Sequence, residues 1–470
     1  MTPVVHHETL DAATAKARKY WNVIRWNPVA FLTIHDLDGS RIFHDRMQPT
    51  FFHDLLRGFR AVAGNMTRAL AGVLRPTPRP HTSRSSPTRQ PYLLLITVGG
   101  PKYASEERAV VEACRAKGVA LRVIHMFFDQ DPSANDLLLS PFALLHRCDY
   151  LGALGRWLGR LVGNARHFVT CDRKQRSLFV AAISSMWQYY LHRAMANRIV
   201  ADHGAPQAVF SLLPSAAMSR SIVERMKTYG VATYGIRTQT TSRNIEHLAI
   251  NTDVLFCKSA REKSEYAAVF NQSGPRLEDG CILSLPEPGG QEPLPLPERY
   301  ALLLGTAPTT EEADGDYDRF NEKLFQAAAA AGLPVVFKSH DLGKELDRAW
   351  FDAHPELTHA VSRVEAIDRN RELIDRAALV ISAPSTLLYY AMLRDVPVVI
   401  VESRPYLGRG YEMETIPTPK VAWRDEVAVG RLDNERLAQL SRAARRWFED
   451  NYYLDKDAGF LVDFMLRHAV

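Results

Sequence analysis

DRAALVISAPSTLLYYAM, residues 375–392, is the stretch of this 470-residue chain that says most about its fold. The apolar run at 379–381 is typical of a buried parallel strand, and a helical pattern begins at Ser385 or Thr386. A helix that starts where such a strand ends presents free backbone N–H groups, and Ser382, Ser385 and Thr386 add hydroxyl donors. This combination suits a phosphate or a nucleotide sugar. An ordinary strand-to-helix turn capped by serine is the alternative interpretation.

A second strand end of this kind lies further upstream. Residues 334–337 read as a short buried strand that runs into Lys338-Ser339-His340. Lys338 and His340 are two positions apart, so an extended strand end would point a cation and an imidazole to one side, where both could bind a phosphate. Open α/β sheets bind ligands outside the carboxyl ends of their strands, so two such ends in one sheet predict a binding site.

Composition sets the class of protein. The chain is 46% hydrophobic and 24% charged, which fits a protein of two domains or more. Its five cysteines are scattered without a C-x-x-C spacing, so they predict neither a disulfide framework nor a zinc site and favour a reducing compartment. The first residues lack the basic segment and apolar run of a secretory leader, and no window has eighteen uninterrupted apolar residues, so we expect a cytoplasmic protein that does not span a membrane.

The positive charge is concentrated at the N-terminus. Residues 1–90 hold 13 Lys and Arg against six Asp and Glu. Apolar residues recur at helical spacing over 51–74 with arginines between them, and 151–168 repeats the pattern around Trp157. Both segments fit helices lying on an anionic membrane surface, which would place the protein at the inner face of the cell membrane. Packing of these helices on their own domain is the alternative. Nucleic-acid binding is not expected, because no basic-aromatic motif or zinc finger is present.

The rest of the chain alternates strand and helix patterns, which predicts α/β domains with parallel sheets. A Pro-rich and Ser-rich linker at 75–87 ends a basic, mostly helical region, 1–90. A first Rossmann-like domain is expected over 91–284, a Pro-rich connector over 285–298 and a second Rossmann-like domain over 299–470, facing each other across a cleft. We expect the helical segment at 459–468 to cross back onto the first domain.

Two such domains look like a GT-B glycosyltransferase. Lys338-Ser339-His340 and Ser385-Thr386 resemble the Lys-x-His-Pro and Ser-Ser/Thr motifs of bacterial capsule and lipopolysaccharide transferases, among them polysialyltransferases, Kdo transferases and glycerophosphotransferases. This chain has Asp341 where those motifs have proline. The resemblance covers roughly residues 91–460 and implies a transferase of polysaccharide biosynthesis that uses a CMP- or UDP-linked sugar. It implies phosphate or nucleotide contacts for His340, Ser385 and Thr386. The predicted donor-binding residues are Gly305, Thr306, Lys338, His340, Ser382, Ser385 and Thr386.

The first domain is then expected to hold the acceptor, a polysaccharide or glycolipid, and the general base. His125 and Asp129 lie at the end of the strand expected at 120–127 and are the candidate catalytic residues. Gly99, Gly100, Arg237 and Gln239 follow other strands and are candidate acceptor or cleft residues, although Arg237 and Gln239 equally fit domain packing. Asp129-Gln130-Asp131 also fits an Asp-x-Asp metal motif, but a chance loop explains so short a match. We therefore expect neither a metal nor another cofactor.

Two other functions stay open. One is a sugar-nucleotide epimerase with the same two-domain fold, although cleft carboxylates and a compact Gly-rich nucleotide loop are scarce in this sequence. The other is a non-catalytic protein that binds a nucleotide or a partner. Fold alone does not decide among these functions.

Overall fold

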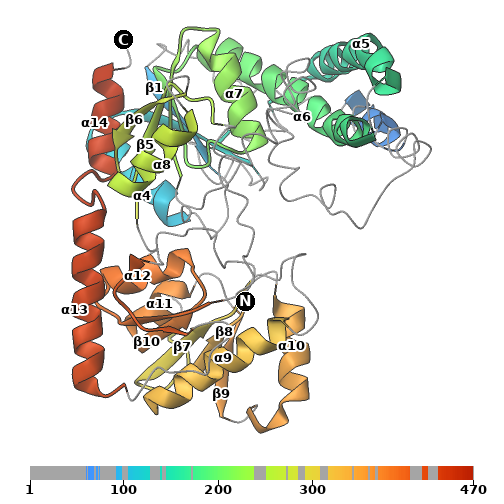
Figure 1. Cartoon of the computed structure of the whole chain (residues 1–470). Helices are drawn as coiled ribbons and strands as arrows, with labels where there is room; N and C mark the ends of the chain where they lie inside the picture. The colour runs from blue at the N-terminus through green and yellow to red at the C-terminus, as the bar shows by residue number, and fades with distance from the viewer. Residues whose placement is uncertain are drawn as a thin grey trace.

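A computed structural model gives the three-dimensional structure. It describes residues 60, 62–67, 70–71, 73–74, 91–97, 104–126, 138–139, 144–170, 173–237, 250–270, 274–283, 292–306, 316–340, 343–357, 360–365, 369–402, 415–421 and 432–468. Two parallel six-stranded sheets dominate these residues (Figure 1).

The first sheet has the strand order β2-β1-β3-β4-β5-β6, and every pairing in it is parallel. Its strands are β1 (Tyr92–Thr97), β2 (Ala120–His125), β3 (Ala208–Ser211), β4 (Ala232–Ile236), β5 (Val254–Cys257) and β6 (Arg276–Asp279). Its helices are α4 (Ala104–Ala116), α5 (Arg147–Thr170), α6 (Arg173–His203), α7 (Ala217–Lys227) and α8 (Ala260–Phe270).

The second sheet has the order β12-β11-β10-β7-β8-β9, again with parallel pairings throughout. Its strands are β7 (Tyr300–Leu304), β8 (Val335–Lys338), β9 (Val361–Val364), β10 (Ala377–Ser382), β11 (Val398–Val401) and β12 (Lys420–Val421). The helices after β7 are α9 (Asp316–Ala331), α10 (Lys344–Ala353), the 3₁₀ turn η4 (Pro355–Leu357), α11 (Asn370–Asp375), α12 (Thr386–Leu393), α13 (Asn434–Asn451) and α14 (Ala458–His468).

These strand orders define two Rossmann-like domains, as the sequence predicts. Counted from its own first strand, the second sheet runs 6-5-4-1-2-3, which is the doubly wound Rossmann order, and the first begins 2-1-3-4-5 as in flavodoxin-like folds. In each sheet the order in which successive strands are added reverses beside the first strand. The reversal lies between β1 and β3 in one domain and between β7 and β10 in the other, and ligands of doubly wound sheets bind at that point.

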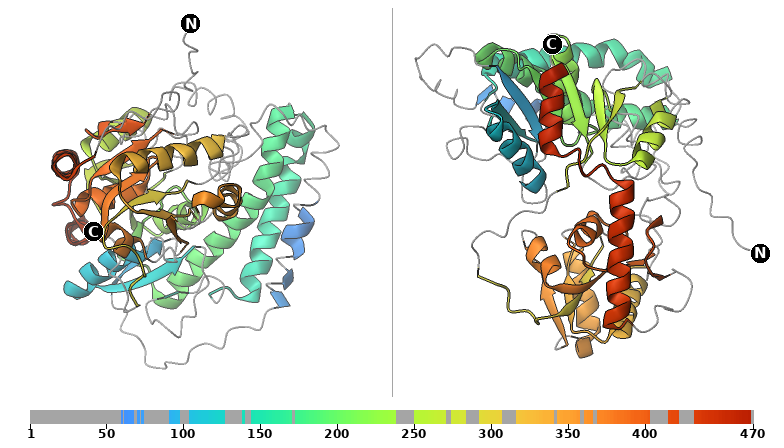
Figure 2. Two further views of the ribbon diagram at one scale, coloured as in Figure 1. Left: turned by 90° about the horizontal axis from the view of Figure 1, so that it is seen from below. Right: turned by 90° about the vertical axis from the view of Figure 1, so that its left-hand side faces the viewer.

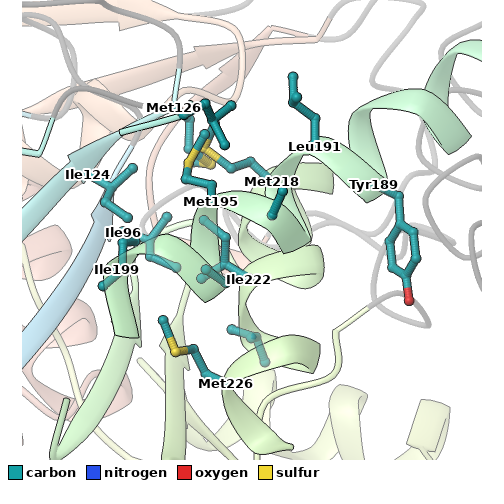
Figure 3. Packing of buried hydrophobic residues seen from close by; sticks show 14 of the residues in the cluster. Ile96, Ile124, Met126, Tyr189, Leu191, Met195, Ile199, Met218, Ile222 and Met226 are labelled. Carbon is teal, nitrogen blue, oxygen red and sulfur yellow. The ribbon is translucent and has the colours of Figure 1, made fainter. Parts of the chain in front are cut away.

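Apolar strands covered on both faces account for this architecture. All residues of β1 and of β7 are buried, as expected for central parallel strands with helices on either side. Figure 3 shows one face of the first sheet, where Ile96 and Ile124 meet Met195 and Ile199 of α6. Met226 of α7 belongs to the same cluster. Burial of such side chains contributes about 1.5–3 kcal/mol each, so the long helix α6 is held by its packing.

The apolar stripe expected at 151–168 lies on α5 and packs inside the protein around Trp157. The Trp157 side chain is fully buried, and its Nε1 donates a hydrogen bond to the carbonyl of Ile183 on α6 at 3.0 Å. The packing alternative is therefore confirmed for this tryptophan. Leu151 and Val162 on other sides of α5 are exposed. Residues 62–67 are helical, but most of the segment expected at 51–74 lies outside the described residues. Association with a membrane surface stays a prediction.

The C-terminal helices connect the two domains. Helix α13 packs on the second domain through Phe448, whereas Leu461 and Met465 of α14 join the core of the first sheet. Lys117, at the end of α4, forms a 2.7 Å ion pair with Asp463 on α14. The expected crossing back onto the first domain is confirmed, and Figure 2 shows α13 and α14 running past both domains.

The Pro-rich connector follows β6 and precedes β7, the last strand of one sheet and the first of the other. Its described part is fastened to the second domain, because Arg376 donates to the carbonyls of Leu294 and Leu296. The exact domain boundaries drawn from the sequence stay a prediction. Within the part of the chain that the structure describes, every helix is too short or too polar to span a bilayer.

Candidate functional site

The reversal point of the second sheet carries several of the predicted donor-binding residues. Strand β7 runs into Gly305 and Thr306, and its neighbour β10 ends at Ser382, shortly before α12 begins. Ser382 pairs with Leu304 at the end of this ladder. Sequence reasoning thus placed these residues at the edge where doubly wound sheets bind ligands.

The predicted Lys338-Ser339-His340 segment borders the same point, because β8 pairs with the other side of β7. The N–H of Gly305 donates to the carbonyl of Lys338 at 2.9 Å. A β-carbon on Gly305 would lie 3.3 Å from both that carbonyl oxygen and the backbone nitrogen of His340, so glycine allows the two strand ends to approach closely. The Lys338 side chain is buried, with Nζ 3.3 Å from the carbonyl oxygen of Ser339, whereas His340 is half-buried.

A buried polar network supports this edge from behind, and the sequence analysis missed it. The Tyr317 hydroxyl donates a 2.6 Å hydrogen bond to Oδ1 of Asp347. Burial raises the pKa of Asp347, and the bond from Tyr317 opposes that rise. Asn321 is fully buried, and its side chain and the Ser339 hydroxyl also oppose the rise in the pKa of Asp347. These groups come from α9 and α10, so only the tertiary fold brings them together.

Ser385 caps helix α12. Its backbone is extended, with φ −143° and ψ 146°, and its side-chain oxygen accepts a hydrogen bond from the N–H of Leu387 at 3.3 Å. The capping interpretation of this turn is therefore confirmed. Capping uses the hydroxyl as an acceptor, so its O–H remains a donor, and the phosphate interpretation is compatible with the cap. Thr386 is the first residue of the helix and is half-buried.

The corresponding edge of the first sheet holds His125 and a carboxylate that the sequence analysis did not select. Nε2 of His125, the last residue of β2, lies 3.0 Å from both carboxylate oxygens of Glu107 in the first turn of α4. His125 is 5% exposed, and its Nδ1 has no hydrogen-bond partner in the structure. In the tautomer that donates a proton from Nε2 to Glu107, Nδ1 is the acceptor nitrogen of the ring.

Two other buried hydroxyls without a hydrogen-bond partner follow or end neighbouring strands of this sheet. Thr97 ends β1 and pairs with His125 across the ladder, and its Oγ1 has no partner in the structure. The same holds for Oγ of Ser215, which lies between β3 and α7. Ala216 supplies no side-chain cap to α7. Thr97 and Ser215 therefore leave buried hydroxyls with unused hydrogen-bonding capacity at the carboxyl ends of β1 and β3, on either side of the reversal point.

Several predicted residues cannot be placed in this way. Gly99, Gly100, Asp129 and Gln239 lie outside the described residues, as does the whole Asp129-Gln130-Asp131 segment. Arg237 directly follows β4 and is buried, and its charge opposes the rise that burial causes in the pKa of Tyr266. This environment fits the packing alternative for Arg237. No group of three or more potential metal-ligating side chains occurs among the residues that the structure describes.

The two domains contact each other through buried charged and aromatic groups. The Tyr390 hydroxyl on α12 donates to Oε1 of Glu106 on α4 at 2.6 Å. Nζ of Lys258, which follows β5, lies 5.9 Å from the ring centroid of Tyr389 and is fully buried. Burial raises the pKa of Glu106, while the bond from Tyr390 and the charge of Lys258 lower it. No sequence motif signals these contacts, because each joins segments far apart in the chain.

No protein-family model and no curated protein sequence matches this chain. Among solved structures, it is similar to a UDP-N-acetylglucosamine 2-epimerase, described as putative, from Listeria monocytogenes, with 11% identity, coverage of 80% of this chain and 95% of that chain, and a TM-score of 0.49. It is also similar to the glycosyltransferase SnogD from Streptomyces nogalater, with 14% identity over 81% of this chain and 100% of that chain and a TM-score of 0.47. MurG from Acinetobacter baumannii gives 10% identity over 80% and 99% of the two chains and a TM-score of 0.45. Similarity at this level does not distinguish a transferase from an epimerase.

Proposed function

We propose that the chain is a glycosyltransferase that moves a sugar from a CMP- or UDP-linked donor to a hydroxyl of a cell-surface polysaccharide or lipid-linked acceptor. The observation that carries the proposal is the convergence of phosphate-suited groups at the reversal point of the second sheet. Gly305 and Thr306, the Lys338-Ser339-His340 segment and the start of α12 reach this point from three adjacent strands.

Each group has a part in donor binding. The first N–H groups of α12 and its dipole favour a phosphate. Lys338 adds a positive charge, His340 an imidazole and Ser385 a hydroxyl donor, and charge-assisted bonds of this kind are about twice as strong as neutral ones. Gly305 lets the Lys338-Ser339-His340 segment lie close against the end of β7.

In the proposed transfer step, the first domain supplies the base and the second domain holds the donor. His125 takes the proton of the acceptor hydroxyl at Nδ1, and the oxygen attacks the anomeric carbon of the donor sugar. The bond from that carbon to the phosphate oxygen breaks, and the nucleotide leaves with the electron pair. Lys338 and the N–H groups of α12 stabilise the charge that develops on the phosphate. Asp129, the other candidate base, stays a proposal because it lies outside the described residues.

The proposed acceptor and cellular location rest on the positive charge of the N-terminal region and on its exposed apolar residues. The basic N-terminal region and the exposed apolar residues Met66, Leu70 and Leu74 favour a peripheral position at the inner face of the cell membrane, where lipid-linked acceptors are found. The proposed partners are therefore a nucleotide-sugar donor, a glycolipid or polysaccharide acceptor and an anionic membrane surface.

Incubation of the full-length protein with CMP- and UDP-linked sugars, with and without a mixture of glycolipid acceptors, tests this function. A transferase releases nucleotide faster when an acceptor is present. An epimerase converts the donor to its isomer without acceptor and without a matching release of nucleotide. Tight nucleotide binding without turnover of any donor would favour the non-catalytic alternative and overturn our proposal.

A further inference from the structure

Two adjacent glutamates in the first turn of α4 make contacts in opposite directions. Glu107 holds Nε2 of His125 at the edge of the first sheet. Glu106 is buried and accepts the Tyr390 hydroxyl from α12 of the second domain at 2.6 Å. The Ser105 hydroxyl donates to the other carboxylate oxygen of Glu106 at 2.7 Å, so both oxygens are fixed. Figure 1 shows α4 and α12 facing each other where the domains meet.

Helix α12 is the helix whose N-terminus carries the proposed donor phosphate. Tyr390 lies in its second turn and is buried. A helix of eight residues is short and internally hydrogen-bonded, so a displacement of its first turn also displaces Tyr390. The contacts therefore run without a gap from the donor site through Tyr390 and Glu106 to Glu107 and His125.

We propose that Glu106 and Glu107 are positioning residues through which helix α4 couples occupancy of the donor site to the orientation of the His125 imidazole. This inference rests on the proposed function, because it assigns the donor to α12 and the base to His125. Donor phosphate at Ser385 fixes α12, Tyr390 holds Glu106 in place, and Glu107 keeps the proton of His125 on Nε2. A bound donor thus restricts the movement of α12 and, through Glu106 and Glu107, the orientations open to the His125 imidazole.

The far end of α4 supports this role. Lys117, just past the end of the helix, is paired with Asp463 on α14, and Val110 and Cys114 of α4 are buried in the core of the first sheet. The helix is therefore fixed at its C-terminal end, and its first turn contacts the second domain through Glu106. Tyr390→Phe removes the hydrogen bond to Glu106 and leaves the aromatic ring in place.

The first arm of the test needs no ligand. The full-length protein is labelled with ¹⁵N-histidine, and the His125 signals are assigned by their loss in His125→Asn. Glu107→Ala should reduce the preference of His125 for a proton on Nε2 by about fivefold, the population change that one net hydrogen bond supports. Glu107→Gln keeps an acceptor oxygen and should preserve the preference. Tyr390→Phe should also move the His125 signals. Signals unchanged in Tyr390→Phe would overturn the coupling.

The second arm adds CMP, with UDP in a parallel titration. In the wild-type protein the His125 signals should move along the same saturation curve as nucleotide binding measured by calorimetry. In Tyr390→Phe this response should be lost while the dissociation constant stays within about fivefold of the wild type. Tyr389→Phe, which removes the neighbouring hydroxyl of the same helix, is the matched control and should keep the response.

The two arms separate the two hypotheses. An equal His125 response to CMP in the wild type and in Tyr390→Phe would overturn the coupling and leave the donor site intact. Failure of the wild type to bind either nucleotide would remove the proposed donor site, and the ligand-free arm then decides on its own whether α4 positions His125.

Discussion

A β-carbon placed on Gly343 would lie 2.7 Å from the carbonyl oxygen of Thr306, so the turn after β8 rests directly on the end of β7. The N–H of Gly343 also donates to the carbonyl of His340 at 2.9 Å. This contact sets the distance between the two strand ends on which the donor site is built. A side chain at position 343 must therefore displace either the turn after β8 or the end of β7.

Gly343→Ala tests that relationship. The added methyl group meets backbone and the Tyr317 hydroxyl, and overpacking of this kind costs about 1–3 kcal/mol. We expect a lower free energy of unfolding in urea and weaker CMP binding by calorimetry. Gly159→Ala on α5 is the control, because nothing lies within 4 Å of its β-carbon. Equal stability and affinity in both variants would show that the turn does not shape the site.

Substitutions of Ser385 separate its cap from its proposed contact with phosphate. Ser385→Ala should lose both, with about 1 kcal/mol of stability from the missing cap. Asparagine and aspartate both cap helices well, but only aspartate brings a negative charge to the site. We therefore expect Ser385→Asn and Ser385→Asp to unfold like the wild type, while Ser385→Asp alone loses nucleotide affinity. Equal nucleotide affinity in Ser385→Asn and Ser385→Asp would contradict the placement of the donor phosphate at the start of α12.

The pH dependence of stability should report Asp347. Burial raises its pKa in the folded protein, so the folded state binds the proton more tightly than the unfolded state does. The stabilising contribution is present below the ordinary aspartate pKa and is lost as pH rises through the raised value. Asp347→Asn keeps an acceptor for the Tyr317 hydroxyl and cannot ionise. Urea unfolding over that pH range should show the wild type losing stability relative to Asp347→Asn as pH rises. A constant difference between the two would contradict the prediction.

Much of the fold is predictable from local sequence, because the signals for central strands are local. The β7 run of five buried residues and the β10 run are continuous apolar segments, and each ends at small or hydroxyl-bearing residues. Their positions and ends are therefore predicted well. Short or peripheral elements such as β9, α11 and β12 were not predicted, because two to six residues carry too little periodicity.

The candidate site can be predicted from the sequence only where strand ends indicate it. Gly305 and Ser385 follow apolar strands and Lys338 ends one, so position along the chain is enough to select them as candidates. The partners of these residues come from elsewhere: Tyr390 and Glu106 are 284 positions apart, and Glu107 is 18 positions from His125. A single sequence holds no local signal for such pairs. The stripe around Trp157 shows the converse limit, since one helical period fits burial in a core and contact with a membrane equally well.

Membrane association should depend on the N-terminal region. Basic residues near an anionic surface contribute about 1 kcal/mol each, and an apolar stripe adds to this. Full-length protein should sediment with vesicles that contain phosphatidylserine, less so at high salt, and deletion of residues 1–90 should abolish most of the binding. Val62 and Val73 pack against the core of the first domain, so the folding of the truncated protein is checked by circular dichroism. Equal vesicle binding by the two folded proteins would restrict this region to a packing role.

Activity should not require a divalent cation. The charge of the leaving nucleotide is met by Lys338, His340 and the N–H groups at the start of α12, and fixed donors of this kind stabilise a developing phosphate charge. Turnover of the donor identified by the nucleotide-sugar screen should therefore persist after dialysis against EDTA. His340→Ala is the companion variant and should weaken nucleotide binding by about 1–3 kcal/mol, as expected for a lost charge-assisted hydrogen bond. Loss of turnover in EDTA with rescue by Mn²⁺, together with loss in Asp129→Ala and Asp131→Ala, would instead assign the donor phosphate to a metal held by the Asp129-Gln130-Asp131 segment.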